Sequence, residues 1–335
     1  MNALRAVYSY PFPEVWPHLV AVERALERDL LMTTTTHERA TELLGPLFTP
    51  RLDVPRTSTG ALDLDELHTP VLQRILAAYE PIAPGISAYP YVYPTPGTSE
   101  GIHKLLATLR TRKGIDTIST YRGEYEGYAA YAEDLGMRVR TIEDDARPHG
   151  WAFVSNPSAR DGNLLRDGTV TNLLDTGYTV ALDLAYAGMT ERSPIDVRDP
   201  RIGAVFLSLS KPYGVFRYRI GCTLTREPIA SLYGSKWFKD PVRLLQGLRI
   251  VEALPPGTLQ ERYRGVQRWA IDTLSAEAGI PIRPSDVVLL GHLTADDAMR
   301  MTGAQREALA PYARGDGYRF CLTPLFETHE RITVP

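Results

Sequence analysis

Lys211 is the residue of this sequence with the most distinctive chemistry. The chain has five lysines among 37 basic residues, so arginine supplies most of its positive charge. A lysine amine, unlike a guanidinium, can lose its proton when desolvated and can form an imine with an aldehyde. Lys211 follows the apolar run 204–207 and lies between Ser208, Ser210 and Arg219. We therefore expect a reactive lysine at the end of a buried strand; the alternative is a plain charge at a solvated strand end.

A buried acid is the second candidate group. The apolar pattern of residues 178–182 runs directly into Asp183, and Tyr186 follows three residues later. A carboxylate at the end of an apolar strand is costly unless a cation or a protonated group lies beside it. A pyridinium nitrogen would be such a partner, because the ionised carboxylate keeps the ring protonated. The alternative is an acid that caps the loop to the next strand.

A glycine turn with hydroxyl residues precedes a predicted helix that ends near Leu109. The turn reads Gly97-Thr98-Ser99. Free backbone N–H groups and the positive end of a helix dipole suit a phosphate. An ordinary helix cap with Ser99 or Thr98 as the N-cap explains the same residues equally well.

Two further loops follow predicted strands. Tyr125 and Tyr128 come after the strand pattern 116–120, and an aromatic at that place could lie flat on a cofactor ring. Both tyrosines could instead pack on a helix face. Asn156 begins an Asn-Pro turn that ends at Gly162, and as a bare turn it would be unremarkable.

These segments occur in the order that pyridoxal 5'-phosphate (PLP) enzymes of the aspartate-aminotransferase fold require, and the sequence resembles that superfamily (fold type I) over residues 60–222. It loosely resembles the alliinase and tryptophan-aminotransferase branch, but departs from it at Pro212–Arg217. The resemblance rests on Gly97, Thr98, Ser99, Tyr125, Asn156, Asp183, Tyr186, Ser208, Ser210, Lys211 and Arg219.

The resemblance implies a role for each of these residues. Lys211 would hold PLP as a Schiff base and later act as a general base, and Asp183 would face the ring nitrogen. Tyr125 would stack on the ring, while Asn156 and Tyr186 would share its ring oxygen. The remaining residues would bind the phosphate: Gly97, Thr98, Ser99, Ser208, Ser210 and Arg219.

The resemblance also suggests a substrate contact near the C-terminus. Arg331 lies in an Arg-Ile-Thr segment that resembles the strand whose arginine binds the substrate α-carboxylate in this superfamily. A planar, two-pronged donor suits a carboxylate. We therefore expect Arg331, together with Asn156, to bind substrate; an exposed arginine on an edge strand is the alternative.

Apolar spacing predicts the elements that must position these residues. Predicted helices cover residues 15–32, 37–44, 63–79, 225–254 with a break at 239–241, 259–279 and 295–309, and two more end at Leu109 and Leu135. Predicted strands cover 116–120, 138–142, 151–154, 178–182, 204–207 and 287–290, with others near Phe320 and Ile332. We expect an α/β protein with a large PLP-binding domain, whose mostly parallel sheet is sandwiched by helices, at residues 56–256. A smaller α+β domain would combine residues 1–55 with 257–335.

Composition excludes other classes of partner. The net charge of −3 argues against nucleic acid and against an anionic membrane surface. Cys222 and Cys321 are too few for a disulfide framework or a metal cluster, and they suit a reducing cytoplasm. We expect no secretion signal, no membrane span and no metal. The resemblance implies a homodimer.

The sequence is compatible with three functions. The first is an aminotransferase that acts on an amino acid and a 2-oxo acid, in biosynthesis or specialised metabolism. The second is a PLP-dependent β- or γ-lyase or replacement enzyme, since none of the named residues decides between the two reactions. The third is a non-catalytic, aminotransferase-like regulator, which the intact Lys211 and Asp183 disfavour.

Overall fold

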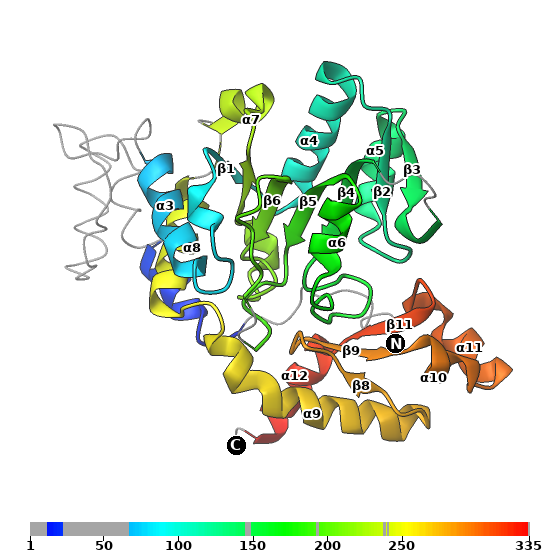
Figure 1. Ribbon diagram of the computed structural model, residues 1–335. Helices are drawn as coiled ribbons and strands as arrows, with labels where there is room; N and C mark the ends of the chain where they lie inside the picture. The colour runs from blue at the N-terminus through cyan, green and yellow to red at the C-terminus, as the bar shows by residue number, and fades with distance from the viewer. Residues whose placement is uncertain are drawn as a thin grey trace, which may run out of the picture.

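A computed structural model of the protein describes residues 12–22, 67–144, 149–191, 194–236, 239 and 241–333. Its centre is a seven-stranded sheet flanked by helices, and a smaller four-stranded sheet lies beside it (Figure 1). The strands of the large sheet are β1 (Tyr91–Thr95), β2 (Thr117–Thr120), β3 (Arg138–Thr141), β4 (Gly150–Ser155), β5 (Tyr178–Leu184), β6 (Ile202–Ser208) and β7 (Gly221–Thr225).

The large sheet is mostly parallel. Its order is β1-β7-β6-β5-β4-β2-β3, and the pairs among β2, β3, β4, β5 and β6 are parallel, whereas β7 runs antiparallel to both β6 and β1. The helices of this part are α3 (His68–Tyr79), α4 (Ser99–Arg112), α5 (Gly127–Asp134), α6 (Thr169–Asp175), α7 (Ala230–Ser235) and α8 (Pro241–Ala253).

The central strands are apolar on both faces because helices cover both. Val154 and Leu182 belong to one hydrophobic cluster, with residues of α3, α6 and α8. Phe153 and Ala181, their neighbours along the same strands, belong to a second cluster with residues of α4 and α5. Successive side chains of a strand point to opposite faces, so a strand buried on both sides is a continuous apolar run. This is why the sequence pattern identified these strands.

The smaller sheet is antiparallel and has the order β10-β11-β9-β8. Its strands are β8 (Arg283–Pro284), β9 (Leu290–Leu293), β10 (Ala313–Arg314) and β11 (Gly317–Cys321). The helices of this part of the chain are α10 (Ala295–Met299), α11 (Gly303–Leu309) and α12 (Thr323–Thr333). The long helix α9 (Thr258–Ala278) leads from the large sheet and runs along the small one (Figure 1). Backbone bonds also join the two parts, from Val287 N–H to Gly162 C=O (2.9 Å) and from Val288 N–H to Met189 C=O (3.0 Å).

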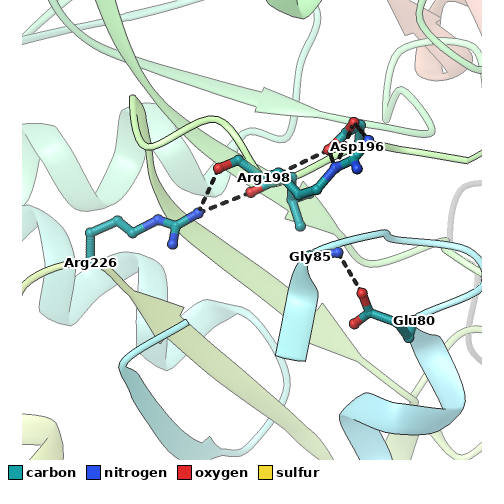
Figure 2. A network of polar contacts seen from close by, with 6 residues as sticks. Glu80, Gly85, Asp196, Arg198 and Arg226 are labelled. Carbon is teal, nitrogen blue, oxygen red and sulfur yellow. Dashed lines mark hydrogen bonds and ion pairs between the residues drawn. The ribbon is translucent and has the colours of Figure 1, made fainter. Parts of the chain in front are cut away.

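A polar network ties down the end of the large sheet opposite the carboxyl ends of β5 and β6 (Figure 2). Glu80 accepts a hydrogen bond from Gly85 N–H (2.7 Å), and Arg198 pairs with Asp196. Arg226, directly after β7, donates to the carbonyls of Val197 (3.1 Å) and Arg198 (3.2 Å). The loop before β6 is thereby fastened to the sheet, and these arginines serve the fold rather than the cavity at the other end.

Several boundaries differ from the sequence expectations. Thr225 ends β7, so helix begins only at Ala230, after the turn. The strand expected at 287–290 starts at Leu290, and the helix expected at 295–309 is two helices, each begun by its own capping box. Of the helix predicted at residues 15–32, residues 16–22 are helical, and the rest lies outside the described residues. The helix predicted at 37–44 and the first four residues of the one predicted at 63–79 also lie outside them.

The prediction of a strand near Ile332 was wrong, because residues 323–333 form helix α12. Phe326 of this helix is fully buried and stacks on Tyr263 of α9, with ring centres 5.7 Å apart. His329 contacts Trp269 one turn further along (4.8 Å). Tertiary packing against α9 therefore outweighs the β-branched residues at the end of the segment.

Among the described residues, none of the helices combines the length and the apolar character that a membrane span needs. In the same part of the chain, no three His, Cys, Asp or Glu side chains gather closely enough to hold a metal ion.

Candidate active site

Polar residues end three neighbouring strands of the large sheet. Ser155, Asp183 and Ser208 are at or next to the carboxyl ends of β4, β5 and β6, and Ser155 pairs directly with Asp183 in the sheet register. The carboxyl ends of parallel strands are where open α/β sheets build ligand sites. A cavity of about 780 Å³ opens there, and all three side chains line it.

Nine of the eleven cofactor-site residues expected from the sequence line this cavity. They are Thr98, Ser99, Tyr125, Asp183, Tyr186, Ser208, Ser210, Lys211 and Arg219. The segments that carry them span more than a hundred residues of chain, and the fold alone brings them together. Gly97 and Asn156 do not line the cavity, although each contacts a residue that does.

Lys211 and Asp183 face the same cavity. The Lys211 amine lies 4.2 Å from the centre of the Tyr186 ring, a distance at which a cation is attracted to the ring face. Asp183 is 3% exposed, and burial raises the pKa of its carboxyl, while the nearby Lys211 charge opposes that rise. The carboxylate accepts hydrogen bonds from the Tyr128 hydroxyl (3.1 Å) and Ala185 N–H (2.9 Å). It is therefore oriented by two donors of the protein.

Two tyrosines stand beside this pair. Tyr125 lines the cavity, and its hydroxyl lies 3.4 Å from Ser99 Oγ; burial raises its pKa to about 12. Its ring meets the Tyr128 ring edge to face, with centres 5.4 Å apart. A Cβ on Gly127 would lie 2.4 Å from the Tyr125 ring, so the glycine makes room for this orientation. Burial, followed by the charge of Asp183, raises the pKa of Tyr128 well above its usual range.

One part of the cavity wall suits an anion. Arg219 has φ of 52° and lies against the backbone of Gly97, where an added Cβ would come within 2.8 Å of its guanidinium. Ser210 N–H donates to Ser208 Oγ (3.1 Å), and the buried Ser210 Oγ has no hydrogen-bond partner among the described residues. Helix α4 begins at Ser99 on the same wall, and its fourteen residues direct the positive end of a dipole towards it.

Asn156 is held by the fold at the edge of the site. Its peptide bond to Pro157 is cis, and its N–H donates to the Asp183 carbonyl (3.0 Å). Its side-chain oxygen accepts a hydrogen bond from Leu165 N–H (3.1 Å). The residue is therefore part of the turn that follows β4, next to the cavity wall.

Four charged cavity residues were missed in the sequence. They are Glu124, Glu126, Arg314 and Arg319. Arg319 is in β11 of the small sheet and donates to the Ala159 carbonyl of the large part. In the sequence, Arg319 is an arginine between Tyr318 and Phe320. That pattern is common in half-exposed strands, so it does not mark a site residue. Arg331 is in α12, and its side chain lies outside the described residues.

Comparison with known proteins identifies the fold. No family model matches the sequence. A histidinol-phosphate aminotransferase from Thermococcus kodakarensis is 28% identical over 138 residues, which is 41% of this chain and 41% of that protein. The match to this curated relative therefore spans about two fifths of its length.

Solved structures match over almost the whole chain. Histidinol-phosphate aminotransferase from Sinorhizobium meliloti, solved with pyridoxal-5'-phosphate, superposes with a TM-score of 0.62 at 14% identity, covering 97% of this chain and 88% of that chain. The chain has the aminotransferase fold. YbdL from Escherichia coli, reported with a methionine aminotransferase function, gives 0.59 at 12% identity, with coverages of 98% and 93%. MppP, solved with the product 2-ketoarginine, gives 0.64 at 14% identity, with 97% of each chain covered. The expected fold class is thus confirmed.

Proposed function

We propose that this protein is a PLP-dependent aminotransferase, which carries an amino group from an amino acid to a 2-oxo acid. The observation that carries the proposal is that Lys211 and Asp183 face one cavity, whose lining also includes Arg219, an unpartnered serine hydroxyl and the start of α4. An amine, a buried carboxylate and an anion site are what an aldehyde, a pyridine nitrogen and a phosphate on one molecule require.

The residues fit this cofactor. The buried Ser210 hydroxyl needs a hydrogen-bond partner, and a phosphate oxygen of PLP would supply it. Arg219 and Ser208, which line the same cavity, would bind the phosphate as well. Lys211 would hold the aldehyde and Asp183 the ring nitrogen. Tyr125 would lie on the ring, with Asn156 and Tyr186 near its oxygen. When bound, PLP supplies an electron sink that stabilises negative charge on the substrate α-carbon.

The chain's own residues supply proton transfer and orientation. The Lys211 amine is the group within the cavity that would take a proton from the substrate α-carbon and return it. The Tyr186 ring, 4.2 Å from Nζ, restricts where that amine can lie. The Tyr128 hydroxyl and Ala185 N–H stabilise the ionised form of Asp183 against the effect of burial.

For the substrate carboxylate we propose Arg319. It reaches the cavity from the small sheet, and its bond to the Ala159 carbonyl fixes one of its donors while others remain for a ligand. Arg331, the residue expected from the sequence, stays the alternative. The homodimer, the domain boundaries, the cytoplasmic location and a role in specialised metabolism remain predictions.

The experiment is a half-reaction. Purified protein loaded with PLP is mixed with single amino acids from a panel of twenty, and the cofactor spectrum is recorded. An aminotransferase changes the spectrum stably to that of the amine form, and a 2-oxo acid restores the original spectrum. A lyase releases ammonia and a 2-oxo acid while the original spectrum persists, and that result would contradict the proposal.

A further inference from the structure

Glu124 is a buried cavity residue that the proposed chemistry does not use. It is 8% exposed and lines the cavity just before Tyr125. One carboxyl oxygen accepts a hydrogen bond from Ser155 N–H (3.2 Å). The other accepts from the Ser155 hydroxyl (2.5 Å) and from Tyr125 N–H (3.3 Å). The carboxyl group is therefore surrounded by three donors of the protein itself.

The hydrogen bonds continue from Glu124 to the cavity wall. The Ser155 oxygen accepts from Ala159 N–H (2.6 Å), and the carbonyl of the same Ala159 accepts from Arg319. A single line of bonds thus runs from Glu124 through Ser155 and the turn after β4 to the guanidinium of Arg319. Both ends of this line are on the cavity wall.

Only an ionised carboxylate satisfies all of these bonds. Both of its oxygens face backbone N–H donors, so a glutamine amide in either orientation would place its NH₂ group against one of them. The Ser155 hydroxyl has one proton, which it directs at Glu124, leaving its oxygen free for Ala159 N–H. Protonated Glu124 would compete for that oxygen, and the turn would lose its fixed acceptor.

We propose that Glu124 is a positioning residue for recognition of the substrate carboxylate: as an ionised acceptor it fixes Ser155 and the Ala159 peptide, and thereby orients Arg319. The inference rests on the proposed function in one respect, that PLP is bound here and Arg319 meets the carboxylate of the amino acid.

The surroundings of Glu124 make this role depend on pH. Burial raises the pKa of Glu124 to about 7, against the opposing effects of the Ser155 bonds and the positive charge of Arg160. The titratable groups around it include the phenols of Tyr121 and Tyr128, whose pKa values are raised first by burial and further by the Glu124 charge. The carboxylate is therefore ionised above about pH 7 and largely protonated at pH 5.5.

The test compares two stable probes that differ in one carboxylate: N-phosphopyridoxyl-L-alanine and N-phosphopyridoxyl-ethylamine. Their dissociation constants are measured at pH 8 by calorimetry on the full chain freed of cofactor. Wild-type protein should prefer the alanine probe by about 10- to 100-fold, as expected for a charged hydrogen-bonded pair. Glu124→Gln should lose about tenfold of this preference and bind the ethylamine probe as wild type does. The exposed Glu133→Gln on α5 is the matched control and should keep the preference.

Two further measurements separate positioning from a merely structural role. In wild-type protein the preference should fall between pH 8 and pH 5.5, whereas in Glu124→Gln it should not vary. Ser155→Ala keeps the carboxylate but cuts the line of bonds, so it should also lose the preference. If Glu124→Gln does not fold, the Ser155→Ala variant tests the proposal in its place.

The results that overturn the inference are distinct from failure of the proposed function. An unchanged preference in Glu124→Gln and Ser155→Ala, or an equal loss of affinity for both probes, contradicts positioning by Glu124. If wild-type protein binds neither probe, the proposed function is contradicted, and so is this inference, which rests on it.

Discussion

Replacing Glu124 by glutamine should change how the stability of the protein depends on pH. The pKa of Glu124 is about 7 in the folded protein, against an ordinary value of 4.5. Between these values the folded protein holds a proton that the unfolded chain has released. At about 1.4 kcal/mol per pH unit, the difference amounts to about 3 kcal/mol.

The direction follows from the raised pKa. The stabilisation that protonated Glu124 contributes is fully present below pH 4.5 and is lost as the pH rises through about 7. Glutamine does not titrate. The free energy of unfolding of wild type minus that of Glu124→Gln should therefore fall by about 3 kcal/mol between pH 4.5 and pH 8. Groups that titrate alike in both proteins cancel in this difference.

Urea unfolding of the cofactor-free proteins, followed by tryptophan fluorescence at a series of pH values, measures this difference. Mismatched donors in the variant add an offset that does not depend on pH. Glu133→Gln removes the same charge from an exposed helix position and should show no such slope. A wild-type minus Glu124→Gln difference that stays constant across this range would refute the reasoning.

Four other substitutions test separate parts of the site. Gly97→Ala should weaken PLP binding about tenfold or more in an absorbance titration, because φ is 79° there and a Cβ would come within 2.8 Å of the Arg219 guanidinium. Unchanged binding would show that the phosphate does not bind beside Gly97 and Arg219. Asp183→Asn should keep PLP bound but slow the half-reaction by about 100-fold or more in stopped flow, because it removes the charge that faces the ring; a wild-type rate would contradict that role. Arg319→Gln should raise the half-saturating amino acid concentration about 10- to 100-fold, whereas Arg331→Gln should leave it unchanged; the reverse result would assign the carboxylate to Arg331.

The central site could be predicted because its residues end apolar runs. Asp183 and Ser208 lie at or next to the ends of strands that are buried on both faces, and such strands are visible in sequence. Parallel pairing then places their ends side by side, as the register of Ser155 with Asp183 illustrates. Local pattern and sheet topology were sufficient for this part of the molecule.

The remainder of the site depends on contacts between distant segments. Glu124 accepts hydrogen bonds from Ser155, which is 31 residues away, and Arg319 donates to the carbonyl of Ala159, 160 residues away. Neither residue differs locally from an ordinary surface charge. Arg331 was assigned to a strand by a short local similarity, whereas Phe326 and its contact with α9 place the segment in a helix. Such packing has no local signal in the sequence.

The most direct test of the central claim is to identify the residue that carries the cofactor. PLP is added to the purified protein, borohydride is used to reduce the complex, and the modified peptide is mapped by mass spectrometry. We expect one phosphopyridoxyl group on Lys211 and its loss in Lys211→Ala. Modification of Lys104, Lys113, Lys236 or Lys239 in place of Lys211, or no reducible adduct in wild-type protein, would contradict it.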